Sequence, residues 1–150
     1  MTDHPSGLFT SNEIDMVLLR ALQARLQEDD ATAHQLEIFL MRMGVDDSSW
    51  QWYVYHLLAC ARRYAKDALK LTALNELLMV AETLALNTPE VLLDVYATGA
   101  YAACIQNDTD QTLTFFLGTA LILDQHPDIT QNAKQYALRH ISEVRKHLNG

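Results

Sequence analysis

The residues best suited to chemistry lie between positions 50 and 63, where aromatic, imidazole, thiol and guanidinium groups are crowded together. His56 and Cys60 are four residues apart, so on a helix they share one face and allow the thiol–imidazole contact that nucleophilic catalysis uses. A helix interior offers this pair no oxyanion site, and a satisfied core pair is the favoured interpretation. An enzyme built on His56, Cys60 and Glu82 is therefore the least favoured of three functional hypotheses.

The sequence holds no other motif of a catalytic or metal site. Its six histidines form no His-Glu-x-x-His pattern, and Cys60 and Cys104 have no partner at zinc spacing. A glycine-rich phosphate loop and a Gly-x-Ser-x-Gly elbow are also missing from the sequence. The sequence thus predicts a protein that is not an enzyme and binds no metal or cofactor.

Four aromatic residues cover more than one face of the helix expected here: Trp50, Trp52, Tyr53 and Tyr55. They cannot all pack into one core, so one face must meet another repeat, a second copy of the chain, or a partner. Aromatic side chains anchor interfaces because they bury a large area and keep a polar group. Trp52 and Tyr55 are therefore candidates for partner binding, and a homodimer stays open as an alternative.

Composition and charge narrow the class of partner. The 150 residues are 49% hydrophobic, which favours one folded domain and excludes a disordered chain. The net charge is −8, and the segment from Leu71 to Ala133 holds eight acidic residues but no lysine or arginine. Phosphate groups are bound by clustered cations, so this segment argues against nucleic acid and anionic lipid. Two interpretations stay open: attraction of a basic protein partner, and solubility alone.

The amino-terminal residues and the cysteines indicate where the protein works. The stretch from Met1 to Gly7 has no basic and apolar signal pattern, and the uncharged stretch from Gln111 to Leu123 is too short to cross a bilayer. Two lone cysteines suit a reducing compartment. We therefore expect a cytoplasmic protein with no membrane insertion.

Seven helices are expected to position these residues, because apolar residues recur at helical spacing and glycine and proline are few. Residues 1–10 are expected to form a flexible tail and residues 11–150 a single domain of helical repeats. Signals for helix starts stand, in chain order, at Thr10–Glu13, Glu28–Asp30, Asp47–Ser49, Thr72, Thr88–Glu90, Asn107–Asp110 and Pro127–Asp128. Gly44 is placed to end the second helix.

One short sequence motif nearly occurs twice. The segment from Leu84 to Glu90 returns 38 residues later as Ile122 to Asp128, and each copy ends an apolar stretch before a proline and an acid. Recurrence at this interval indicates stacked helix pairs. With small residues at Ala81, Gly99 and Ala120, the chain from Ser11 to Leu148 resembles degenerate tetratricopeptide repeats.

The resemblance implies an all-α fold of three stacked antiparallel helix hairpins in a right-handed superhelix. The seventh helix, with Lys134, Arg139, Arg145 and Lys146 on its polar side, would cap the apolar end of the stack. The first helix of each pair would line a concave groove that binds a segment of another protein. The partner-binding set, which includes the exposed aromatic candidates, is Trp52, Tyr53, Tyr55, His56, Arg63, Leu93, Tyr96 and Ala100.

The favoured function is a protein–protein interaction module, an adaptor or chaperone. In size and architecture the chain is similar to the small cytoplasmic chaperones of bacterial type III secretion. The alternative is an acidic inhibitor or immunity-type protein that masks a basic enzyme surface with the segment from Leu71 to Ala133. Oligomeric state and the identity of the partner stay open at this point.

Overall fold

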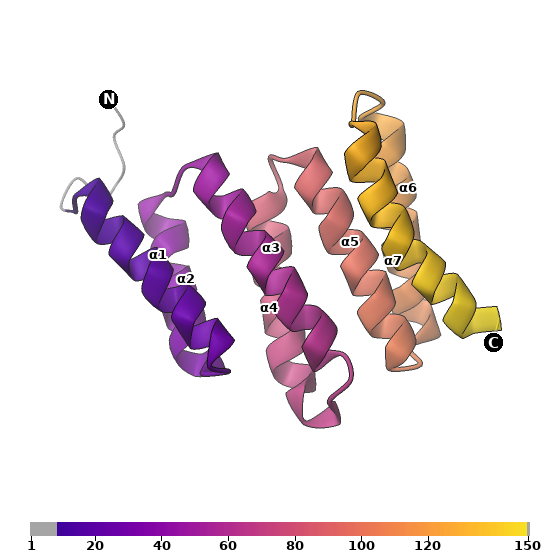
Figure 1. Cartoon of the computed structure of the whole chain (residues 1–150), viewed down its shortest axis with the longest axis horizontal. Helices are drawn as coiled ribbons and strands as arrows, with labels where there is room; N and C mark the ends of the chain where they lie inside the picture. The colour runs from indigo at the N-terminus through magenta and orange to yellow at the C-terminus, as the bar shows by residue number, and fades with distance from the viewer. Residues whose placement is uncertain (1–8, 150) are drawn as a thin grey trace.

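In the computed structural model, which describes residues 9–149, the chain is all-helical (Figure 1). The α-helices are α1 (Ser11–Leu26), α2 (Asp30–Met43), α3 (Asp47–Tyr64), α4 (Leu71–Ala85), α5 (Pro89–Ile105), α6 (Thr109–Gln125) and α7 (Gln131–Asn149), with a 3-10 turn at Ala68–Lys70. The prediction of an all-α protein with seven helices is confirmed for these residues. The tetratricopeptide-like arrangement stays a prediction.

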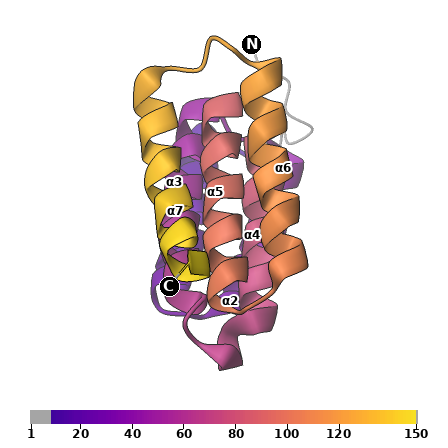
Figure 2. The same cartoon turned by 90° about the vertical axis from the view of Figure 1, so that its right-hand side faces the viewer.

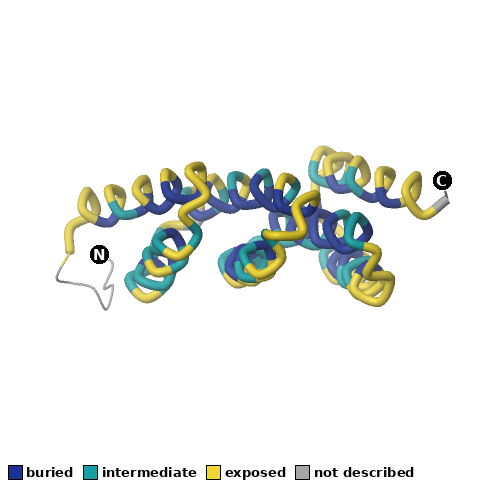
Figure 3. Tube along the Cα trace, turned by 90° about the horizontal axis from the view of Figure 1, so that it is seen from below, coloured by how far each residue is buried: buried dark blue, intermediate teal, exposed yellow. Residues whose placement is uncertain are grey.

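The helices pack mainly with their neighbours in the chain. α1 packs against α2, α3 against α4, and α5 against α6. The helices α1, α3 and α5 lie side by side in front of α2, α4 and α6 (Figure 1). Buried residues line the contact between the two rows (Figure 3). The last helix, α7, packs on α5, so α6 and α7 lie on opposite sides of that helix (Figure 2).

Helix α5 is the centre of the C-terminal half, and its sequence explains why. Eleven of its 17 residues are buried, and many of these are alanine or glycine. Small side chains let neighbouring helices approach closely, so α5 accepts α3, α4, α6 and α7 around its circumference. Both the open groove and the buried Asp94–His140 pair described below therefore involve α5.

The N-terminal half has a polar centre that sequence reasoning missed. Arg25 is fully buried and pairs with Glu37 at 2.6 Å and with Asp30 at 3.0 Å. The hydroxyl of Tyr53 donates a hydrogen bond to the same Glu37 carboxylate. A buried charge is tolerated only when paired and hydrogen-bonded, so this network fixes how α1, α2 and α3 meet. Tyr53, predicted to bind a partner, is fully buried and presents no surface.

Several predicted helix ends are confirmed. The side chain of Thr10 accepts from the Glu13 amide at 3.2 Å, and Glu13 accepts from the Thr10 amide at 2.8 Å, which forms the predicted capping box. Gly44 ends α2 with a φ of 82°, and Pro89 opens α5. Of the predicted tail, residues 1–8 lie outside the described residues, whereas Phe9 packs edge-on against Phe39.

Two predicted helix starts are wrong. Thr72 does not cap α4, because the helix already begins at Leu71, after a 3-10 turn that the Asp67 side chain caps at the amide of Leu69. Pro127 does not open α7, which begins four residues later at Gln131. There the hydroxyl of Thr130 accepts from the amide of Ala133 at 3.3 Å.

Candidate binding groove between α4 and α6

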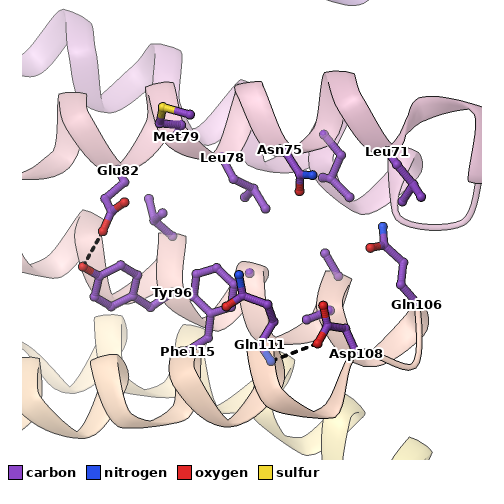
Figure 4. A pocket seen from close by; sticks show the side chains of 15 residues that line it. Leu71, Asn75, Leu78, Met79, Glu82, Tyr96, Gln106, Asp108, Gln111 and Phe115 are labelled. Carbon is purple, nitrogen blue, oxygen red and sulfur yellow. Dashed lines mark hydrogen bonds between the residues drawn. The ribbon is translucent and has the colours of Figure 1, made fainter.

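A groove separates α4 from α6, with α5 as its floor (Figure 4). Its volume is about 460 Å³, within the range of ligand-binding clefts. Residues from Leu71 to Glu82 form the α4 wall, and Asp108, Gln111 and Phe115 form the opposite wall. The fold thus leaves a space next to α5 that no helix among residues 9–149 fills.

Two glycines and two aromatic rings shape the groove floor. A Cβ atom on Gly99 of α5 would lie 2.6 Å from the ring of Phe115 on α6. A Cβ atom on Gly118 of α6 would lie 2.7 Å from the ring of Tyr96 on α5. Each glycine therefore makes room for an aromatic ring of the facing helix. The two rings lie 6.1 Å apart between centroids and hold each other in place.

The end of the groove near Glu82 is acidic, and a hydrogen bond there joins α4 to α5. The hydroxyl of Tyr96 on α5 donates to the Glu82 carboxylate on α4 at 2.7 Å (Figure 4). Burial, followed by this bond to Glu82, raises the pKa of Tyr96 to about 12. The hydroxyl therefore keeps its proton at neutral pH and remains a donor. The contact holds the carboxylate at the rim of the groove.

The other end of the groove is lined by side-chain amides. Asn75 of α4, Gln106 directly after α5 and Gln111 of α6 all line it (Figure 4). The Nε2 atom of Gln106 is buried and has no hydrogen-bond partner. Buried donors are almost always satisfied, so this atom is an exception within the groove lining.

The walls of the groove are apolar between these two polar ends, and they include no lysine or arginine. The side chain of Met79 at the rim is 63% exposed, and Leu71 is also exposed. Leu78 and Phe115 are half-buried deeper in the groove. The groove thus combines an apolar middle with carboxylates at Glu82 and Asp108, which suits an apolar segment with basic side chains.

The predicted partner-binding residues on α5 are divided between its two sides. Tyr96 lies in the groove between α4 and α6. Leu93 and Ala100, in contrast, lie beneath α7: Leu93 packs with Ile141 and Ala100 with Val144. Both residues are no more than 1% exposed. The side of α5 that was expected to face a concave groove is thus occupied by the chain's own last helix.

Apart from the buried Tyr53, the predicted residues on α3 remain at least partly at the surface, but they point to different neighbours. Trp52 is 42% exposed and contacts His56 edge-on, on the side facing α1. Tyr55 is 44% exposed and lies against Tyr136 of α7. Arg63 is exposed and donates to the thiol of Cys60 at 3.4 Å. The eight predicted residues therefore do not converge on one groove.

The three residues suspected of catalysis are also not brought together. Glu82 lies in the groove between α4 and α6, whereas His56 and Cys60 lie on α3. His56 packs against Trp52, and the Cys60 thiol contacts Arg63 and the backbone oxygen of Arg25. Burial raises the pKa of Cys60, which disfavours the thiolate that a nucleophile needs.

A buried titratable pair lies beneath α7, and sequence reasoning missed it. Asp94 of α5 is only 4% exposed, and neither carboxylate oxygen has a hydrogen-bond partner. His140 of α7 lies 3.6 Å away, and Arg62 of α3 lies 3.4 Å from the same imidazole nitrogen. Burial raises the pKa of Asp94 to about 7 and lowers that of His140 to about 4. The one sequence signal was a lone acid within an apolar helix.

The outer side of α6 carries leucines at helical spacing that other elements leave open. Leu113, Leu117 and Leu121 are more than half exposed. They follow one another at intervals of four residues, so they form one stripe along the helix. α7 packs on α5, and this stripe remains open beside it. The homodimer suggested by the sequence stays a prediction.

Within residues 9–149, no three side chains of histidine, cysteine, aspartate or glutamate are grouped so that they could hold a metal ion. In the same part of the chain, no helix has the length and apolarity needed to span a bilayer. Comparison of the chain with protein-family models, with curated proteins and with solved structures gives no significant match. The function is therefore inferred from the geometry of the sites themselves.

Proposed function

We propose that the protein is a protein–protein interaction module, an adaptor or chaperone, that binds a segment of a partner protein between α4 and α6. The observation that carries this proposal is the open groove over α5, with its exposed apolar rim and the exposed side-chain amides of Asn75 and Gln111. The opposite side of α5 is closed by α7. A bound segment would cover the apolar residues on the open side of α5, as α7 covers those on the closed side.

The composition of the groove favours a protein ligand. Aromatic side chains at the centre of a cleft are typical anchors of protein interfaces, and Tyr96 and Phe115 occupy that position. Complete burial of an exposed apolar side chain is worth about 1.5–3 kcal/mol, and Met79 and Leu71, which are 63% and 39% exposed, would gain the corresponding fraction when covered. The rim therefore offers binding free energy to an apolar segment.

The charge of the groove favours a segment with lysine or arginine. Glu82 and Asp108 line it, and cations are missing from its lining residues and from the whole segment Leu71–Ala133. Charge complementarity of this kind sets partner choice and the rate of association. We expect the partner segment to be apolar in its middle and basic toward its ends.

The alternative, an acidic inhibitor that masks a basic surface, requires acids gathered on one face. The acids of the segment Leu71–Ala133 are instead spread over several faces. Asp94 is buried beneath α7, Glu90 accepts from Thr130, and Glu76 faces the cleft between α2 and α4. This distribution favours a groove for one segment over a broad acidic patch.

Selection from a displayed library of random 16-residue peptides tests the proposal. Asn75 is exposed and lines the groove, so Asn75→Trp would block it. Thr72→Trp, at an exposed position on the same helix that lines a different cleft, is the matched control. We expect enriched peptides to bind the wild type and the Thr72 variant but not the Asn75 variant. A failure to enrich any peptide whose binding is blocked by Asn75→Trp would refute the proposal.

A further inference from the structure

Deepening the function proposed above, on which it depends, we infer that the groove binds an extended segment rather than a helix. The amides of Asn75, Gln106 and Gln111 would hold the backbone of this segment, and a lysine or arginine side chain would lie beside Glu82. Three observations carry this inference: the length of the groove, the side-chain amides that line it, and the distance between its polar ends.

The length of the groove suits a short segment. The α4 wall runs from Leu71 to Glu82, which at the helical rise per residue is about 16 Å. An extended chain covers this distance in about five residues.

The amide end of the groove distinguishes the two conformations chemically. A side-chain amide offers donors and an acceptor, which match the carbonyl and N–H of a peptide unit. Asn75 and Gln111 are exposed, so their side-chain amides can reach a segment in the groove. An extended segment has free carbonyls along its length, whereas the interior carbonyls of a helix are already bonded. An extended segment therefore offers free peptide groups to these amides along its whole length, whereas a helix offers them only at its ends.

The distance between the polar ends sets the register of the segment. Asn75 and Glu82 are seven residues apart on α4, which corresponds to about 10 Å. An extended chain covers this distance in about three residues. The segment would therefore carry its basic side chain about three residues from the peptide unit bound by Asn75. One apolar side chain between them would contact Leu78 and Phe115 on the groove floor and walls.

Two displayed libraries separate the conformations. One presents linear random heptapeptides, which are too short to form a stable helix in water. The other presents a randomised face of a stable 18-residue helix. We expect the heptapeptide library to yield binders that Asn75→Trp blocks and Thr72→Trp does not. In these binders lysine or arginine should be enriched at one position, three residues from the peptide unit that contacts Asn75. The helix library should yield none.

The outcomes distinguish this inference from the proposed function. Groove-dependent binders from the helix library alone would overturn the extended segment while leaving the interaction module intact. A lack of groove-dependent binders from both libraries would overturn both. Heptapeptide binders without an enriched lysine or arginine would overturn the role given to Glu82.

The role of Gln106 is tested with the enriched heptapeptides. Gln106→Leu keeps the approximate size of the side chain and removes the amide, and should weaken binding about tenfold. Gln125→Leu, at an exposed position near the end of α6, is the matched control and should leave binding unchanged. Asn75→Leu provides a second test on an exposed residue, where folding is not at risk. Undiminished binding by both groove variants, with unchanged melting temperatures, would refute the amide contacts.

Discussion

The two sides of α5 are completed in different ways. On one side, α7 covers Leu93, Ala97 and Ala100 with its own apolar residues, and the contact is fully buried. On the other side, α4 and α6 stand apart, and Tyr96 and Phe115 line an open groove. Among residues 9–149, a helix therefore covers one side and none covers the other. The open side is the one where an external segment would bind.

Each side also contains a polar group without a partner, and the difference between these groups is instructive. Beneath α7, the Asp94 carboxylate is sealed from solvent and from any ligand. On the groove side, the Nε2 atom of Gln106 is also buried, but the Gln106 side chain borders an open space. The Asp94 carboxylate reduces the stability of α7 docking, whereas Gln106 stands next to the space where a segment would bind.

The largest effect is expected from a substitution that disrupts the packing of α7 on α5. Val144 of α7 is fully buried against Ala100 and Cys104, so Val144→Asp would place an unpaired charge there. We expect a loss of about 3–5 kcal/mol in the contact of α7 with α5. Hydrogen exchange should become faster for residues 131–149 and remain slow in α3. Ser142→Asp, at an exposed position of α7, is the control and should leave exchange unchanged.

A smaller effect is expected from removing the buried carboxylate beneath α7. With its pKa raised to about 7, Asp94 contributes stability at low pH that is lost as the pH rises through 7. His140, with its pKa lowered to about 4, contributes stability at high pH that is lost as the pH falls from about 6.5 to 4. In the wild type these two contributions nearly cancel between pH 4 and 6.5.

Asp94→Asn removes one of the two opposing contributions. Urea denaturation at pH 8 should show a free energy of unfolding about 1–3 kcal/mol above the wild type. The gain should disappear toward pH 4, because the wild-type carboxyl is then protonated. Asp15→Asn, on the exposed surface of α1, should show no such pH dependence. A gain that stays constant from pH 4 to pH 8 would contradict the raised pKa.

The shape of the open side depends on the contact of Gly99 with Phe115. Gly99→Ala would place a Cβ atom 2.6 Å from the ring, and we expect a loss of about 1–2 kcal/mol despite the better helix propensity of alanine. In a Phe115→Ala background the same change should stabilise the helix by about 0.5–1 kcal/mol. A double-mutant cycle by urea denaturation measures this reversal of sign. Equal effects in both backgrounds would remove the packing argument.

The smallest effect concerns the charge at the groove rim. Glu82→Lys should weaken binding of the enriched basic heptapeptides about fivefold, because it replaces attraction by repulsion at a partly exposed site. Glu76→Lys reverses the same charge on the same helix outside the groove and should have little effect. Fluorescence anisotropy at two salt concentrations measures both. The difference between the variants should shrink as salt screens the charges.

Local signals in the sequence predicted the helices well. The capping box at Thr10 and Glu13 and the glycine at Gly44 depend on backbone chemistry close in the chain, so they could be read from residue types alone. The repeated motif was less reliable. Pro89 opens α5, but Pro127 stands in a loop, and α7 begins at Gln131. A proline permits a helix start without enforcing one.

The position of the candidate site could not be predicted from local signals. Periodicity correctly placed Leu93 and Tyr96 on α5, but it could not decide which neighbour each would meet. That outcome depends on α7 docking on α5 and on the separation of α4 from α6, which are long-range packing events. Asp94 and Gln106 were missed for the same reason, because a polar residue lacks a partner only within a particular tertiary contact.

The most direct test of the account is a residue-by-residue NMR titration of the full chain with an enriched linear heptapeptide. We expect the amide signals of Asn75, Gln106 and Gln111 to shift together on binding. The signals of Tyr55 on α3 and Tyr136 on α7 should stay in place. Shifts confined to α3 and α7, with the groove signals unchanged, would contradict the claim that the open side of α5 is the binding side.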